Sequence, residues 1–271
     1  MGAATANPAA PDRPRLPPAY RLVALDQVDS TNEEAKRLAA AGAEDGTLVW
    51  ARSQTAGRGR RGRSWDSPAG NLFLSLVLRP DCGPAEAAQL GFVAALGVGD
   101  GVGSVVPPLI EVRYKWPNDV LFNDRKGAGI LLESQLLPDG GLDWLVLGVG
   151  VNVKAYPKDS DFPATSLQFE GAPPGLSEVA LLEAFGRHFL AWTNRWLVDG
   201  FAPIRRAWLA HAYGLGEVIT VNLPRESLRG TFRDLDQDGV LLLEQANGKL
   251  RRIAAGDVHF GGAGSGLAGE G

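Results

Sequence analysis

Gly57-Arg58-Gly59-Arg60-Arg61-Gly62-Arg63 is the stretch on which the choice of fold depends, because it matches the G-x-G-x-x-G pattern of dinucleotide-binding folds. That pattern requires a strand before the glycines and a helix that begins within them. Residues 47–51 supply a strand, but residues 64–71 contain proline and glycine and have no helical periodicity. We therefore expect a binding loop here and no Rossmann-type domain.

The loop lies in an asymmetric charge environment. Five arginines occur from Arg52 to Arg63, with no acidic residue between Asp45 and Asp66, although the chain carries a net charge of −4. Glycine lets backbone N–H groups approach a ligand, and arginine adds a permanent charge with a fork of donors. This favours an anion, which would supply the counter-charge. A solvated basic loop or a nucleic-acid-binding module is the alternative.

The composition is that of a globular chain. With 271 residues, 45% of them hydrophobic, it can form one large core or one large and one small core. The 21% charged fraction and the net negative charge argue against a dedicated nucleic-acid binder. Cys82 is the single cysteine, so we expect a reducing cytoplasm. No apolar run approaches about 18 residues, so we expect no membrane span.

The hydrophobic pattern predicts an α+β fold. Ser30-Thr-Asn-Glu33 has the pattern of a capping box, in which Ser30 and Glu33 cap each other's amides, and predicts a helix over 31–41. Residues 71–79 are apolar on both faces, which predicts a central strand. Apolar steps of three and four predict a core helix over 177–198. We also predict strands at 46–53, 110–115, 128–135 and 142–153, and helices at 84–98 and 203–211.

After Gly214 the sequence changes character. Strand candidates at 218–221, 227–232, 240–244 and 249–253 are separated by closely spaced turn residues, which predicts a small β-barrel. We therefore expect four parts: a disordered leader at 1–19, a catalytic domain at 20–213, a small barrel at 214–260 and a flexible tail at 261–271.

Two further segments place polar residues at strand ends. Lys115-Trp-Pro-Asn-Asp119 precedes Lys126, and both lysines can face the basic loop while Asp119 balances them or holds magnesium. An ordinary polar turn is the alternative. Gly148-Val-Gly-Val-Asn152 puts glycines in a strand, which weakens it unless a ligand or backbone comes close. Asn152 would then contact adenine or a sugar, and a bulged strand end is the alternative.

Patterns for covalent catalysis are missing from the sequence. It contains no G-x-S-x-G elbow, no Walker loop, no cysteine–histidine signature and no histidine-rich metal spacing. We expect its chemistry to depend on positioning and neutralising anions.

The order of these segments resembles the biotin protein ligases. The matching segments are Ser30-Thr31-Asn32, Gln54-Thr-Ala-Gly-Arg-Gly-Arg-Arg-Gly-Arg63, Lys115-Trp-Pro-Asn-Asp119, Lys126-x-x-Gly-Ile-Leu-x-Glu133 and Gly148-x-Gly-x-Asn152. The basic loop together with Lys-Trp-Pro-Asn-Asp is highly specific. The related lipoate ligases share the fold and are not expected to show this loop. A lipoate-type acyl-protein ligase remains the alternative within the superfamily.

The resemblance implies a two-step ligation. Biotin's carboxylate attacks the α-phosphate of ATP, assisted by Mg²⁺, and a lysine of a biotin carboxyl carrier protein then takes biotin from biotinyl-5′-AMP. It also implies a mixed-sheet catalytic domain with packed helices and a C-terminal SH3-like barrel. Few residues precede the first motif, so we expect a cytoplasmic ligase without a DNA-binding domain and without DNA or membrane partners. A homodimer is possible.

Residue roles follow from the same resemblance. Lys126, Arg60 and Asp119 would be catalytic, with Asp119 also the candidate metal ligand. The biotin site would comprise Ser30, Thr31, Asn32, Gln54, Gly57, Arg58, Gly59, Lys126, Gly129, Gly148 and Gly150. The ATP or AMP site would comprise Arg58, Arg60, Arg61, Arg63, Trp65, Lys115, Asn118 and Asn152. Every biotin-facing motif would lie before Lys154.

Overall fold

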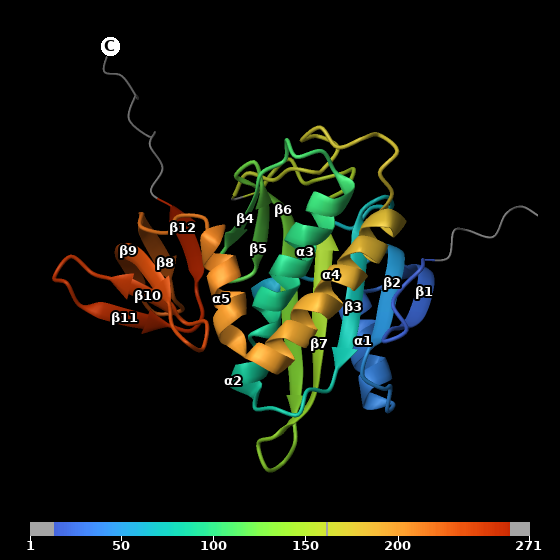
Figure 1. Ribbon diagram of the computed structural model, residues 1–271, viewed down its shortest axis with the longest axis horizontal. Coiled ribbons are helices and arrows are strands. Elements are labelled where there is room, and N and C mark those ends of the chain that lie inside the picture. Colours follow the sequence, from blue (N-terminus) through green and yellow to red (C-terminus); the bar gives the residue numbers. More distant parts are fainter. Residues whose placement is uncertain (1–13, 161, 261–271) are drawn as a thin grey trace, which may run out of the picture.

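The computed structural model describes residues 14–160 and 162–260. A seven-stranded mixed sheet forms the centre of the larger domain. Its strands are β1 (Arg21–Val28), β2 (Thr47–Gln54), β3 (Leu72–Leu78), β4 (Val112–Lys115), β5 (Asp119–Phe122), β6 (Arg125–Leu136) and β7 (Leu142–Val151). They pair in the order β1-β2-β3-β7-β6-β5-β4 (Figure 1). The β1–β2 pair is parallel, and the other neighbours in this sheet are antiparallel.

Helices cover both faces of this sheet. The helices are α1 (Thr31–Ala40), α2 (Pro84–Ala87), α3 (Leu90–Val105), α4 (Glu178–Asp199) and α5 (Phe201–Ala210). Side chains of α1 form a small core with one face, while α3, α4 and α5 form the main core with the other (Figure 1). β3 is buried along its whole length, so the predicted central strand is confirmed.

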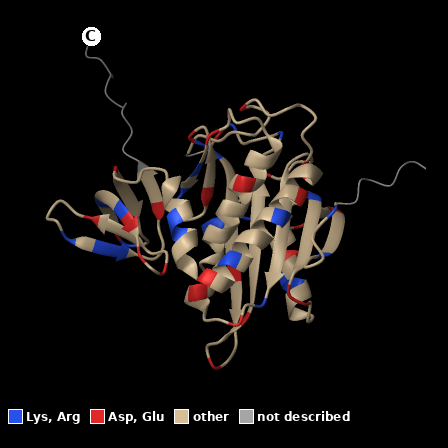
Figure 2. Cartoon of the chain, viewed as in Figure 1, with Lys and Arg blue, Asp and Glu red and all other residues tan. Residues whose placement is uncertain are grey.

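The predicted helix over 84–98 is two helices, and its second part is the most enclosed element of the fold. α3 carries almost no charge along its length (Figure 2). A Cβ at Gly97 would lie 3.1 Å from the Cα of Phe189, and one at Gly101 would lie 3.2 Å from the backbone nitrogen of Phe185. The two glycines therefore let α4 pack closely on α3.

This enclosure corrects our expectation about apolar runs. Pro84–Val105 spans 22 residues and is long and apolar enough, by length and composition, to cross a membrane. However, 67% of that window is buried inside the protein, between the sheet and α4. The apolar composition is explained by burial on two sides, as in the core helix of a globular protein.

The C-terminal strands form an antiparallel sheet beside the larger domain (Figure 1). They are β8 (Val218–Asn222), β9 (Ser227–Leu235), β10 (Leu241–Glu244), β11 (Leu250–Ile253) and β12 (Asp257–Phe260). The order is β11-β10-β9-β8-β12, so β11 and β12 are edges among the described residues and the expected closed barrel is not found. Trp116 Nε1 donates to the Gly239 carbonyl (3.2 Å), which fastens this sheet to the larger domain.

Three strands were missed by the sequence analysis: β1, β5 and β12. β5 and β12 have four residues each, and β1 mixes polar and apolar residues at a sheet edge, so none of them has a clear period of two. Residues 14–19, expected in the leader, pack on the larger domain through Leu16. The rest of the leader up to residue 13, and the expected tail at 261–271, lie outside the described residues.

The α3–α4 contact indicates where a substitution should lower the stability of the fold most. Phe185→Ala should lower the free energy of unfolding by about 3–5 kcal/mol, because it leaves a cavity opposite Gly101. Val198→Ala on the same helix, where the side chain is 82% exposed, should change it by less than about 0.5 kcal/mol. Urea unfolding followed by circular dichroism measures both, and equal losses would contradict this account of the core.

Candidate functional site

A cavity of about 430 Å³ lies at the ends of β3, β6 and β7, between the start of α1, the basic loop and β12. It brings together most of the residues that the sequence analysis singled out. Those that line it are Ser30, Thr31, Asn32, Gln54, Arg58, Gly59, Arg60, Arg63, Trp65, Lys115, Asp119, Lys126, Gly129, Gly148, Gly150 and Asn152.

Gly57, Arg61 and Asn118 are not among the lining residues. A Cβ at Gly57 would lie 2.4 Å from the Trp65 carbonyl oxygen, so this glycine is needed for packing within the loop. Arg61 pairs with Asp257 of the C-terminal sheet (2.6 Å) and does not itself line the cavity. Asn118 Nδ2 donates to the Ile130 carbonyl (3.0 Å), which ties the start of β5 to β6. The structure therefore gives these three residues roles in the walls of the site.

The start of α1 differs from the predicted capping box. Ser30 is the N-cap residue, but its side chain makes no capping hydrogen bond. Asp29 Oδ1 accepts from the Ser30 amide (2.7 Å), and Gln54 Oε1 accepts from the Thr31 amide (2.8 Å). Because Asp29 satisfies the Ser30 amide, Glu33 is free to pair with cations instead.

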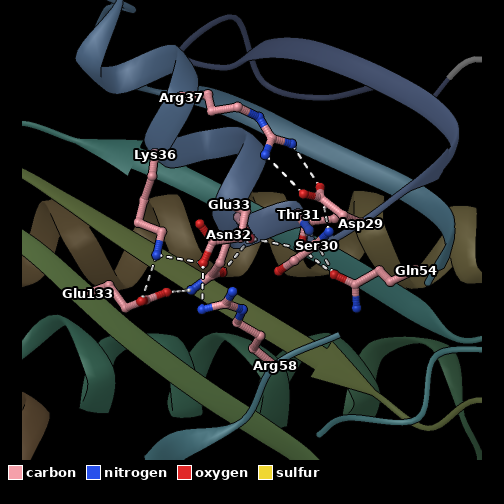
Figure 3. Close-up of polar contacts among 11 residues, drawn as sticks. Asp29, Ser30, Thr31, Asn32, Glu33, Lys36, Arg37, Gln54, Arg58 and Glu133 are labelled. Carbon is pink, nitrogen blue, oxygen red and sulfur yellow. Dashed lines mark hydrogen bonds and ion pairs between the residues drawn. The ribbon is translucent and has the colours of Figure 1, made fainter. Parts of the chain in front are cut away.

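A chain of polar side chains forms one wall of the cavity (Figure 3). Thr31 Oγ1 donates to Gln54 Oε1 (3.1 Å), and the buried Ser75 hydroxyl donates to Asn32 Oδ1 (2.6 Å). Asn32 Nδ2 donates in turn to Glu133 Oε2 (2.8 Å). Ser75 was missed by the sequence analysis, although a single serine inside the apolar run Leu72–Leu78 was the available signal.

Three glycines of the cavity accommodate neighbouring side chains. A Cβ at Gly129 or Gly150 would lie 2.9 or 2.8 Å from the Trp65 ring, and the two glycines are paired across β6 and β7. A Cβ at Gly148 would lie 2.0 Å from Asn32 Oδ1. The glycines therefore allow an indole and an amide to lie flat on the sheet and form walls of the cavity.

Two lysines that line the cavity share one carboxylate. Lys126 Nζ lies 2.8 Å from Asp119 Oδ1, and Lys115 Nζ lies 3.8 Å from Asp119 Oδ2. Burial lowers the pKa of Lys115, whose ammonium also lies over the Phe162 ring. The described residues contain no group of three potential metal ligands, and both Asp119 oxygens face ammonium groups. Asp119 therefore fits a role in holding the lysines better than one as a resident magnesium ligand.

The basic loop obtains its counter-charges from distant carboxylates of the protein. Arg58 lies 3.0 Å from Glu33 on α1, and Arg61 and Arg63 lie 2.6 and 3.3 Å from Asp257 on β12. Our expectation that a ligand supplies the counter-charge therefore does not hold for these three arginines.

Arg60 differs from the other arginines of the loop. It forms no ion pair among the described residues, and its Nη1 lies 3.5 Å from the Gly256 carbonyl oxygen. Burial lowers its pKa. A desolvated guanidinium that lines the cavity without a carboxylate partner is the group of this loop best suited to bind an anion.

The C-terminal sheet completes the cavity. Asp257, Val258 and His259 of β12 line it together with residues of the larger domain. We had expected every biotin-facing motif to lie before Lys154, and β12 was not predicted, so this contribution was missed. The site is thus built from both parts of the chain.

Comparisons with known proteins agree on one family. A model of the biotin/lipoate A/B protein ligase family matches residues 63–210, and a model of the biotin protein ligase C-terminal domain matches residues 214–261. The biotin–[acetyl-CoA-carboxylase] ligase of Paracoccus denitrificans is 42% identical, over 88% of this chain and 100% of that protein. Its namesake from Mycobacterium tuberculosis is 35% identical, over 88% of each. A solved biotin protein ligase from Aquifex aeolicus with biotin and ATP has a TM-score of 0.73 at 28% identity, over 88% of this chain and 97% of that one.

The contact between the loop and β12 predicts a role for Asp257. Asp257→Asn should speed trypsin cleavage within residues 58–63 about fivefold, because losing about 1 kcal/mol of ion pairing opens the loop more often. Asp238→Asn, which disturbs a pair with Arg252 inside the C-terminal sheet, should leave this rate unchanged. Equal cleavage of the wild type and Asp257→Asn under native conditions would mean that Asp257 does not hold the loop.

Proposed function

This chain belongs to the biotin protein ligase family, and we propose that its cavity activates biotin with ATP and passes it to a lysine of a carrier protein. One observation carries this proposal. A neutral polar pocket, formed by Thr31, Asn32 and Gln54, and the cations Arg60 and Lys126 line the same cavity. Biotin has the matching chemistry, with an uncharged ureido ring at one end and a carboxylate at the other.

We assign the pocket residues accordingly. Ser30, Thr31 and Gln54 hold the ureido ring, and Arg60 and Lys126 meet the carboxylate and the α-phosphate. Trp65 and Asn152 hold adenine. Asn152 Nδ2 donates to the Thr165 carbonyl (3.0 Å). Its Oδ1 receives no hydrogen bond from the described residues and can therefore accept one from an adenine amino group.

The first step is an in-line displacement between two anions. A carboxylate oxygen of biotin forms a bond to the α-phosphorus, and the bond from that phosphorus to the bridging oxygen breaks, which releases pyrophosphate. In the second step the amine of the carrier lysine forms a bond to the carbonyl carbon of biotinyl-5′-AMP, the bond from that carbon to the phosphate oxygen breaks, AMP leaves with the electron pair, and the amine gives up a proton to solvent. Cations that neutralise charge and hold geometry are the protein's means of accelerating the first step.

Several further features belong to the same proposal. The residues present do not fit a resident magnesium site, so Mg²⁺ is assigned only as the counter-ion of the ATP substrate. The carrier is a biotin carboxyl carrier protein, as the names of the relatives suggest. The match at 214–261 supports an SH3-like arrangement of the C-terminal sheet. The single free cysteine supports a cytoplasmic location, and a homodimer is possible.

The assignment of Lys126 gives a test of the function. Lys126→Ala should slow biotin-dependent exchange of pyrophosphate into ATP by about 10²–10³-fold, because one cation at the developing charge is lost. The exchange reaction with purified protein measures this, with lipoate in place of biotin as the second arm. Exchange with lipoate and none with biotin would overturn the proposed substrate, and normal exchange by the variant would overturn the role of Lys126.

Arg60 should serve retention of the intermediate. Arg60→Gly removes the arginine of the loop that has no carboxylate partner and adds backbone freedom, so biotinyl-5′-AMP should escape into solvent. The released anhydride acylates lysines without selectivity, and added serum albumin should therefore become biotinylated. Arg52→Gly is the control, because Arg52 stacks on Trp50 outside the cavity. Unlabelled albumin with a variant that still forms the intermediate would contradict this role.

A further inference from the structure

We propose that Glu133, which stands behind the polar wall of the cavity on β6, is a positioning residue for biotin. It fixes the orientation of the Asn32 side-chain amide and thereby leaves Thr31 Oγ1 free to accept hydrogen bonds from a ligand. The proposal rests on the function proposed above and adds a residue that does not itself line the cavity. Figure 3 shows Glu133 at the end of the chain of contacts that runs through Asn32 to Thr31 and Gln54.

The series of hydrogen bonds from Glu133 to Gln54 ends at one side in an ionised carboxylate. Glu133 accepts from Asn32 Nδ2 and from Lys36 Nζ, both at 2.8 Å. Burial raises the pKa of Glu133, but the hydrogen bonds from Lys36 and Asn32 outweigh it and hold that pKa below its usual value. An ionised carboxylate can only accept, so the amide nitrogen of Asn32 faces Glu133 and its oxygen faces Ser75.

The other end is anchored by a backbone carbonyl. The Ser67 hydroxyl donates to the Trp65 carbonyl (2.8 Å) and accepts from Gln54 Nε2 (2.8 Å). The oxygen of Gln54 must therefore face Thr31, whose amide and hydroxyl both donate to it. The two ends of this series of hydrogen bonds thus fix which group donates and which accepts at each step.

The middle of the chain leaves an acceptor for the ligand. Ser75 has one hydroxyl hydrogen and two neighbours, Asn32 Oδ1 at 2.6 Å and Thr31 Oγ1 at 2.8 Å. Because Asn32 presents its oxygen, Ser75 can donate there, and Thr31 has already given its own hydrogen to Gln54. The remaining lone pairs of Thr31 Oγ1 are then available to the N–H groups of a ureido ring.

Replacing the carboxylate by an amide should reverse this direction. In Glu133→Gln the new amide oxygen must turn toward Lys36, which only donates, so its NH₂ group faces Asn32. Asn32 then has to present its oxygen to residue 133 and its NH₂ to Ser75. Ser75 accepts from Asn32 and donates to Thr31, which occupies one of the two lone pairs of Thr31 Oγ1 and leaves fewer for biotin.

The test is the affinity for biotin measured by calorimetry without ATP. Glu133→Gln should weaken biotin binding about 5- to 100-fold, the loss typical of a buried hydrogen bond left unmade. Its affinity for ATP should stay within about twofold, because the reversed chain is confined to the ureido wall. Asp143→Asn is the matched control. Its carboxylate accepts from Arg79 (2.9 Å), is similarly exposed and does not line the cavity, so biotin affinity should not change.

A double variant tests whether Glu133 acts by fixing the donor and acceptor order or only by supporting the structure. Asn32→Asp places two carboxylates together, whereas Asn32→Asp with Glu133→Gln keeps the total charge and lets residue 32 accept from both Gln at 133 and Ser75. The double variant should bind biotin more tightly than either single variant, and the comparison with Asn32→Asp alone suffices if Glu133→Gln folds poorly. Unchanged biotin affinity in folded Glu133→Gln, or a double variant no better than the singles, overturns the proposal. Failure of the wild type to bind biotin would instead overturn the proposed function.

Discussion

The site depends on keeping several cations close together before an anion is present. Two unit charges of like sign about 4 Å apart repel by about 4 kcal/mol near a protein surface, so cations held this close together need carboxylates beside them. Asp119 serves Lys115 and Lys126, and Asp257 serves two arginines of the loop. Arg60 forms no ion pair with a carboxylate among the described residues, although it is buried. The unbalanced charge is thereby concentrated where the cavity can receive a carboxylate or a phosphate.

The architecture follows from this requirement. The carboxylates belong to β5 and β12, which lie in different sheets, and the loop is paired with β12 and with α1. The closely packed α3 and α4 and the contact of Trp116 with the C-terminal sheet hold these parts in one arrangement. A β12 strand that moved away would remove the partner of Arg61 and Arg63 and also one wall of the cavity. The C-terminal sheet is therefore a component of the site as well as a neighbour of the larger domain.

The sequence predicted the elements whose structure depends on local pattern. It did not predict the side-chain contacts that form between residues far apart in the chain. The buried β3 and the long α4 were predictable from local pattern, because β3 is a short run that is apolar on both faces and α4 carries apolar residues at steps of three and four. The pairing of Arg61 with Asp257 joins positions 196 residues apart, which no local pattern contains. The capping box failed for a local reason, because the neighbouring Asp29 accepts from the Ser30 amide, whereas the contact of Gln54 with the Thr31 amide joins two distant elements. Ser75 stands out in the sequence as the one polar residue of an apolar strand, but the sequence does not indicate its hydrogen-bond partners.

The two ends of the cavity are also connected through charge. Lys36 lies 2.7 Å from Glu33 and 2.8 Å from Glu133, and Glu33 holds Arg58 of the loop (Figure 3). One ammonium group therefore touches both the carboxylate that orients the neutral pocket and the carboxylate that anchors the loop. A ligand in the pocket that strengthens the first contact alters the field at the second. Since coupling free energies are reciprocal, any effect that a ligand in the pocket has on the loop is matched by an equal effect of the loop on that ligand.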